Sequence, residues 1–129
     1  MKTDYRAVTL TGGFWKQKED LNRDVTIPAV YTRFDETGRI EAFKCNWKEG
    51  MPNQPHIFWD SDVVKWMEGA AYVLSRENIP ELEEKVEALI DEIEKNQGED
   101  GYLTSISPWS TRKRASPTGT GTSCTAPDT

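Results

Sequence analysis

The sequence is poor in residues that form disulfides or bind metals, and it has no long apolar run. Its 129 residues include two cysteines and one histidine, so neither a disulfide framework nor a zinc site of its own is expected. No apolar run approaches the roughly 20 residues that a membrane-spanning helix needs. The first residues lack the apolar stretch of a secretory signal. We therefore expect a cytoplasmic protein without a membrane partner.

Basic residues are outnumbered as well. The chain has 16 Lys and Arg against 22 Asp and Glu, which gives a formal net charge of -6. A nucleic-acid binder needs a positive field around the phosphates, so we expect no nucleic-acid partner. The hydrophobic residues amount to 36%, which is low for one domain of this length. Part of the chain is therefore expected to stay outside any core.

The shortage of apolar residues is greatest at the C-terminal end. Residues 106–129 consist mostly of Ser, Thr, Pro and Gly, without a helical or a strand period. Such a segment buries too little surface to offset the entropy lost on ordering. We expect a folded part, residues 1–105, followed by a disordered tail, residues 106–129.

Two helices are predicted in the middle of the chain. Segment 80–96 has one apolar face, Pro80 at a favourable first position, acidic residues near its start and Gly98 just past its end. Segment 61–76 is apolar over more than half of its circumference, so it is expected to need partners on several sides. The short connection between the segments favours an antiparallel pair.

The flanking segments are less regular. Residues 14–34 show a helical pattern interrupted by Pro28, which predicts one kinked helix or two short ones. Residues 8–10 predict a short strand, ended by the glycines at 12 and 13. Residues 35–57 have no clear period and predict a long loop. The architecture is expected to be mainly α and incomplete.

The densest group of polar candidates lies where this loop meets the helix. Asp60 or Ser61 is predicted to cap the helix, because these residue types accept hydrogen bonds from the first N–H groups. Asp60 and Asp62 are two residues apart, and such positions point apart on a helix. A paired-carboxylate hydrolase site is therefore less favoured than capping.

The aromatic residues of this region allow two interpretations. Trp66 lies in the middle of an apolar helix and is expected in the core, whereas Trp59 suits a core and a sugar-stacking platform about equally. His56 has no second histidine with which to bind a metal, and Cys45 has no local activating group. Neither is expected to be catalytic, and the chain has no phosphate-binding or dinucleotide-binding motif.

Three motifs occur in a recognisable order. They are Gly13-Phe14-Trp15-Lys16, then Phe58-Trp59-Asp60-Ser61-Asp62-Val63 with Lys65-Trp66, and then Gln97 with Asp100-Gly101-Tyr102-Leu103. Over roughly residues 12–105 this order resembles the N-terminal part of glycoside hydrolase family 127, the β-L-arabinofuranosidase-type enzymes. The second motif is the specific one, since the Asp-Gly-Tyr-Leu turn recurs in many α/α-barrel sugar enzymes.

The resemblance implies the first helices of an (α/α)6 barrel, left incomplete, and a carbohydrate substrate for the full-length protein. It also implies a retaining mechanism with a zinc-held cysteine nucleophile and a glutamate acid/base. Those residues lie downstream of this chain, so no catalytic residue and no cofactor are expected within it, and the chain alone is expected to be inactive. Phe58, Trp59, Asp60 and Asp62 are candidates for contact with the substrate.

The tail offers a reason for the early end of the chain. Back-translation from Ile106 with a shift of one base permits a run that ends His-Glu-Leu-Tyr-Cys-Ala-Gly-His, which looks like the family's next helix motif. We interpret residues 106–129 as out of frame and the chain as an N-terminal fragment. Two alternatives stay open: another α/α-toroid sugar enzyme, of unsaturated-glucuronyl hydrolase or epimerase type, and a small helical interaction module without catalysis.

Overall fold

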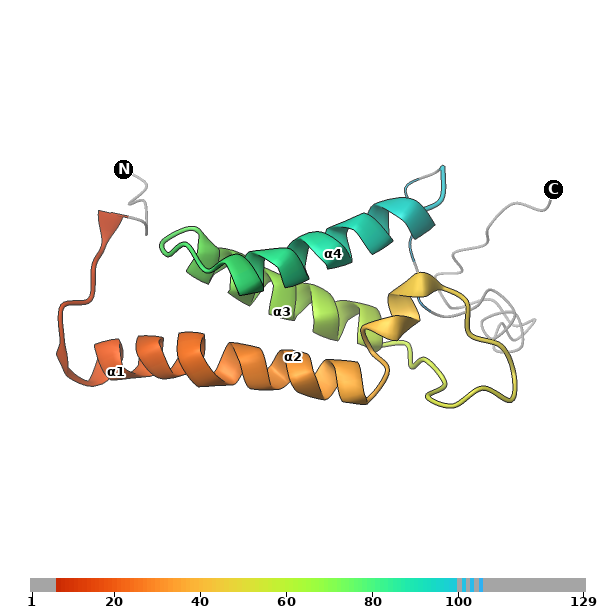
Figure 1. The fold of residues 1–129 in the computed structure, drawn as a ribbon, viewed down its shortest axis with the longest axis horizontal. Coiled ribbons are helices and arrows are strands. Elements are labelled where there is room, and N and C mark those ends of the chain that lie inside the picture. Colours follow the sequence, from red (N-terminus) through yellow and green to blue (C-terminus); the bar gives the residue numbers. More distant parts are fainter. Residues whose placement is uncertain (1–6, 100, 102, 104, 106–129) are drawn as a thin grey trace, which may run out of the picture.

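The computed structural model describes residues 7–99, 101, 103 and 105, and these residues are mainly helical (Figure 1). The elements are α1 (Gly13–Leu21), the π-helix η2 (Asn22–Thr26), α2 (Ile27–Glu36), the 3-10 helix η3 (Glu41–Lys44), α3 (Trp59–Leu74) and α4 (Pro80–Asn96). The predicted mainly α class is confirmed. The disorder and the frame change predicted for residues 106–129 lie outside the described residues.

The strand predicted for residues 8–10 is wrong. These residues are extended but unpaired, because the described part of the chain contains no strand beside which they could form a ladder. The carbonyl of Val8 instead accepts a hydrogen bond from the guanidinium of Arg76. The extended segment is thus held by a side chain rather than by a sheet.

The helical segments α1, η2 and α2 follow one another without a break and form one long rod (Figure 1). Pro28 has no N–H, so the carbonyl four residues earlier loses its usual helical donor. The turn before the proline widens to the π-helix, and there the Thr26 hydroxyl donates to the Leu21 carbonyl, five residues back, at 3.4 Å. The segment is therefore one continuous helical rod rather than two short helices, with a π-helix before the proline where a kink was predicted.

Helices α3 and α4 form the predicted antiparallel pair (Figure 1). Helix α4 spans the predicted residues, while α3 begins two residues before the predicted start and ends two residues before the predicted end. Val73 and Leu74 of α3 pack against the cluster that contains Leu82 and Val86 of α4. The short connection therefore brings the two helices together, as predicted.

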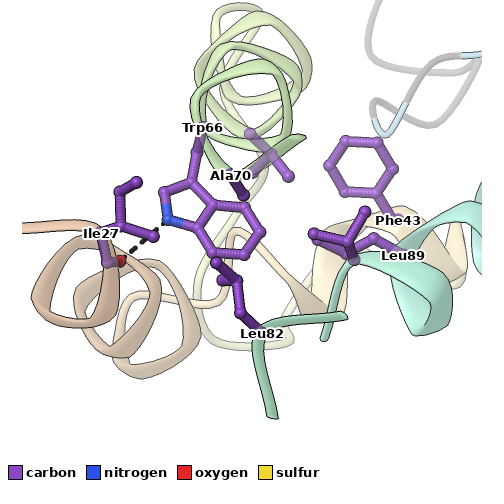
Figure 2. Packing of buried hydrophobic residues seen from close by; sticks show 8 residues of the cluster. Ile27, Phe43, Trp66, Ala70, Leu82 and Leu89 are labelled. Carbon is purple, nitrogen blue, oxygen red and sulfur yellow. Dashed lines mark hydrogen bonds between the residues drawn. The ribbon is translucent and has the colours of Figure 1, made fainter. Parts of the chain in front are cut away.

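The core lies between the three long helical segments, with Trp66 at its centre (Figure 2). The Trp66 side chain is 6% exposed, and its ring lies 5.0 Å from that of Tyr31. Its indole N–H donates to the Ile27 carbonyl at 2.9 Å, which satisfies the buried polar atom. The prediction that Trp66 is a core residue is confirmed. The buried cluster consists of Ile27, Phe43, Val63, Trp66, Ala70, Leu82, Val86 and Leu89.

The long loop predicted for residues 35–57 needs correction. It contains the last residues of α2 and the 3-10 helix η3, and Phe43 in η3 is completely buried. The Asn96 side-chain amide of α4 donates to the Phe43 carbonyl at 3.0 Å and fixes η3 against the end of that helix. The four residues of η3 are too few to show a helical period, so the sequence pattern could not reveal them.

Helix α3 leaves apolar side chains on its outer surface. Val64 and Tyr72 are 49% and 50% exposed, while Val63, Trp66 and Ala70 on the opposite side are buried. This arrangement agrees with the prediction that α3 needs partners on more than one side. Within the described residues, none of the helices combines the length and apolar character needed to cross a membrane. That finding does not test the predicted cytoplasmic location.

Candidate functional site

The four candidate residues lie at one end of the helical bundle, where α3 begins. Phe58 precedes α3 directly, and Trp59, Asp60 and Asp62 belong to its first turn. In Figure 1 this end also carries η3, drawn in yellow, and the C-terminal end of α4. Phe58 is 60% exposed, and the other three side chains are half-buried. The fold thus gathers the candidate residues where three elements meet.

The predicted capping by Asp60 or Ser61 is wrong. The N-cap residue of α3 is Phe58, and no side chain makes a capping hydrogen bond there. The Ser61 hydroxyl donates to the Phe58 carbonyl at 2.9 Å, so it acts as a donor rather than as the acceptor that a cap requires. The reason is the earlier start of α3, which places both residues inside the first turn.

The two carboxylates engage different partners, as their spacing on the helix predicts. Both oxygens of Asp60 accept from the backbone N–H of Ser105, at 3.2 Å each. Oδ2 of Asp62 lies 3.8 Å from Nε of Arg39 in an ion pair. Ser105 is 1% exposed, so Asp60 anchors the segment after α4 against the start of α3. The pair does not converge on one point, as two carboxylates flanking a scissile bond would.

Arg39 is the member of the site that the sequence did not reveal. Its guanidinium carbon lies 5.1 Å from the ring centroid of Trp59 and 5.5 Å from that of Phe34, both within cation–π range. Its Nη1 also donates to the Thr37 hydroxyl at 2.6 Å. One side of the Trp59 indole is therefore covered by a cation.

The end of α2 brings Arg39 to this place. Gly38 has a φ of +79°, its N–H donates to the Asp35 carbonyl at 3.0 Å, and the N–H of Arg39 donates to the Phe34 carbonyl at 2.8 Å. These are the two hydrogen bonds of a Schellman motif, which reverses the chain at a helix end and places the residue after the glycine near Phe34. A glycine followed by arginine at the end of a helical pattern was the available signal.

Comparison with known proteins gives the same family that the motifs indicate. The family model of the beta-L-arabinofuranosidase, GH127 catalytic domain, matches residues 7–122. The chain belongs to glycoside hydrolase family 127. The alternatives, another toroid enzyme and a helical interaction module, are not favoured by this match.

The family 127 chain is also similar to the non-reducing end beta-L-arabinofuranosidase of Bifidobacterium longum subsp. longum. The two are 40% identical over 116 residues, which covers 74% of this chain and 18% of that enzyme. The chain therefore spans less than a fifth of the length of this curated relative. No solved structure shows a significant match to this chain.

Cys45 and His56, for which the sequence predicts no catalytic role, lie before α3 in this family 127 chain. Partial burial, followed by the negative charges of Asp60 and Glu92, raises the pKa of the Cys45 thiol, which disfavours the thiolate that a nucleophile needs. The His56 ring lies 5.1 Å from the Phe58 ring, and its Nδ1 accepts from the Phe58 N–H at 3.4 Å.

The described residues do not fit the zinc site that the family resemblance implies. Zinc in proteins takes three or four Cys, His or carboxylate ligands. Within residues 7–99, 101, 103 and 105, no group of three such side chains lies close enough together to hold a metal ion.

The candidate residues do not line the cavity at the other end of the bundle. That open cavity of about 260 Å³ lies at the connection between α3 and α4. Its lining residues are Leu74, Ser75, Arg76, Glu77, Asn78 and Glu83. The aromatic and acidic candidates are thus separated along α3 from this polar hollow, and no aromatic side chain lines it.

Proposed function

We propose that this chain is the N-terminal part of the catalytic domain of an enzyme that hydrolyses β-L-arabinofuranosides at their non-reducing ends. The observation that carries the proposal is the 40% identity to an enzyme named for that activity. The family match over residues 7–122 supports it. The substrate class is a carbohydrate, and the chemistry is hydrolysis of a glycosidic bond.

Within this function, we assign substrate contact to Phe58, Trp59, Asp60 and Asp62. Aromatic faces pack against the apolar faces of sugar rings, and carboxylates accept hydrogen bonds from sugar hydroxyls. Support comes from the joint position of all four at the start of α3 and from the 60% exposure of Phe58. Asp62 is the better placed carboxylate, because Asp60 already accepts from Ser105 with both oxygens.

Catalysis belongs to residues outside the described part of the chain. Glycoside hydrolysis needs two groups that flank the scissile bond, and Asp60 and Asp62 are held by different partners on different sides of α3. We therefore assign neither a nucleophile nor an acid/base here, and the zinc that the resemblance implies would be held elsewhere in the enzyme. The described residues serve as scaffold and as part of the substrate-binding surface.

The proposed activity is tested with a chimera. Residues 7–105 of this chain replace the matching N-terminal segment of the Bifidobacterium enzyme, and hydrolysis of an aryl β-L-arabinofuranoside is measured. We expect turnover, and we expect Trp59→Ala or Asp62→Ala to raise KM more than it lowers kcat, because these groups bind rather than react. Glu84→Ala, at an exposed charged position of α4, is the matched control. A folded but inactive chimera would contradict the proposal.

The 129-residue chain by itself should hydrolyse no arabinofuranoside, with or without added zinc. The described residues contain neither a convergent pair of carboxylates nor a group of metal ligands, so they cannot assemble the chemistry. Turnover by this chain that disappears in Asp60→Ala or Asp62→Ala would place catalysis in α3 and would overturn the assignment above.

The boundary at residue 105 and the out-of-frame origin of residues 106–129 are also part of the proposal. The family match extends to residue 122, which is past that boundary. The coding DNA distinguishes a family segment that ends at residue 105 from one that ends at residue 122. Sequencing from codon 104 through codon 130 and onward should show the family-like sequence continuing in a frame shifted by one base. A single open frame with no family-like sequence in the other frames would overturn this interpretation.

A further inference from the structure

The side chain of Arg39 connects two helices and a helix end. Its guanidinium lies near the rings of Phe34 in α2 and Trp59 in α3, at 5.5 and 5.1 Å. It donates to the Thr37 hydroxyl at the C-cap of α2 and pairs with Asp62 in α3. The side chain is 26% exposed, so these contacts are shielded from much of the solvent.

A guanidinium is suited to hold two such groups at once. It is flat and permanently charged, so one plane can lie along an indole while its edge faces a carboxylate. Cation–π contacts strengthen when the cation is partly desolvated. Nε of Arg39 is buried and has no hydrogen-bond partner in the described residues, so its charge is balanced through the 3.8 Å pair with Asp62. Movement of either Trp59 or Asp62 would therefore weaken the contacts of Arg39.

We propose that Arg39 is a positioning residue, which fixes the Trp59 indole and the Asp62 carboxylate in the orientation that a sugar meets. The sugar-binding role of these two side chains rests on the proposed function. The positioning itself is a property of this chain and is measured without turnover. In this arrangement the sugar stacks on the side of the Trp59 ring that faces away from Arg39. Asp62 then accepts a hydrogen bond from a hydroxyl of the same sugar ring.

The test uses the 129-residue chain and measures the fluorescence of Trp59 separately from that of the other tryptophans. Arg39→Met and Arg39→Lys are prepared with Trp59 and again with Trp59→Phe, and the difference between matched fluorescence spectra gives the Trp59 signal. We expect Arg39→Met to increase acrylamide quenching of Trp59 on the order of twofold, because one side of the ring loses its cover. Arg39→Lys keeps the charge without the flat stack, so partial restoration is expected.

Arg33→Met is the matched control. Arg33 lies on α2 six residues before Arg39, its side chain is 72% exposed, and it pairs with Glu36 at 3.3 Å. It should leave the Trp59 signal unchanged. A merely structural role of Arg39 would lower thermal stability without a Trp59-specific change, so folded Arg39→Met with unchanged quenching would overturn the proposal.

If the circular dichroism of Arg39→Met shows that this variant does not fold, the proposal is tested with Arg39→Lys and Asp62→Asn instead. Asp62→Asn removes the ion pair and leaves the stack, so the Trp59 signal should change less than in Arg39→Lys. No Trp59 change in either folded variant would overturn the proposal. An inactive chimera would refute the proposed activity and leave this result standing, whereas an active chimera with an unchanged Trp59 signal would refute the positioning role alone.

Discussion

The two ends of the helical bundle are held together by different kinds of contact. At the junction end, where α3 begins, Phe43 is buried, Arg39 stacks on aromatic rings, and Asp60 binds the backbone of Ser105. At the connection end, where α3 turns into α4, ion pairs to the N-terminal rod accompany the apolar packing of Val73 and Leu74. Arg23 pairs with Glu77 at 2.8 Å, and Arg76 pairs with Glu19 at 2.7 Å.

Arginines of similar exposure make different kinds of contact at the two ends. The side chains of Arg23, Arg39 and Arg76 are 20%, 26% and 29% exposed. Arg23 and Arg76 pair with carboxylates of other helical segments or connections, and salt and acid can weaken such surface ion pairs. Arg39 contacts rings and a helix end, which fix its direction. At the junction end, rings, a carboxylate and a helix end thus surround one guanidinium, whereas the open cavity lies at the connection end.

The largest expected effect comes from the buried aromatic of the junction end. Phe43→Ala leaves a cavity where the side chain was completely buried, so it should destabilise the chain by about 3–5 kcal/mol. Phe58→Ala, at a 60% exposed site in the same region, should change stability by only about 0.5 kcal/mol. Urea unfolding followed by circular dichroism measures both. Equal losses would show that η3 is not part of the core.

The turn that delivers Arg39 gives the next largest effect. Gly38→Ala puts a Cβ 2.8 Å from Cβ of Asn53 at a φ of +79°, so we expect a loss on the order of 1–3 kcal/mol. Gly69→Ala is the matched control, because Gly69 lies inside α3 with nothing within 4 Å of the added atom. It should stabilise the chain by about 0.5–1 kcal/mol. Thermal unfolding of the two variants should therefore shift in opposite directions.

Salt should separate the two ends. The loss caused by Arg76→Met should shrink in high salt, because at about 1 M the screening length falls to about 3 Å and exposed ion pairs lose most of their attraction. The loss caused by Arg39→Met should persist, because stacking on rings is less sensitive to salt. Thermal unfolding of both variants in low and high salt measures this. Equal salt dependence would contradict the distinction between the ends.

The smallest expected effect is a loss of stability in acid. It should arise in the N-terminal rod, which α1, η2 and α2 form. A hydrogen bond from Lys16 lowers the pKa of Asp20, and a hydrogen bond from Arg23 lowers that of Asp24. A lowered carboxyl pKa stabilises the fold above the usual carboxyl range, and that contribution is lost as pH falls through the lowered pKa. Titration of the carboxyl resonances by NMR should show both values below that of an unpaired aspartate. Lys16→Met should raise the pKa of Asp20 toward its usual value, whereas the pKa of Asp24 should stay lowered, because Arg23 still donates to Asp24.

Local patterns were sufficient for the long helices and for the family. Pro80 and the apolar spacing after it predicted α4 with its observed bounds, and the apolar surroundings of Trp66 predicted its burial. The cap of α3 was predicted wrongly, because Asp60 and Ser61 have the right chemistry for a cap but lie two and three residues after the observed N-cap residue, Phe58. The assignment of Phe58, Trp59, Asp60 and Asp62 to substrate contact stays a prediction.

The sequence by itself determined where the long helices lie, which side of α4 is apolar, and which family motifs the chain carries, because these properties depend on residues within a few turns of one another. Only the tertiary structure decided that Phe43 enters the core and that Asp60 binds Ser105, which is 45 residues away. It also decided that Arg39 covers one side of Trp59. Contacts between residues so far apart depend on how helices pack, and short-range spacing carries no record of that packing.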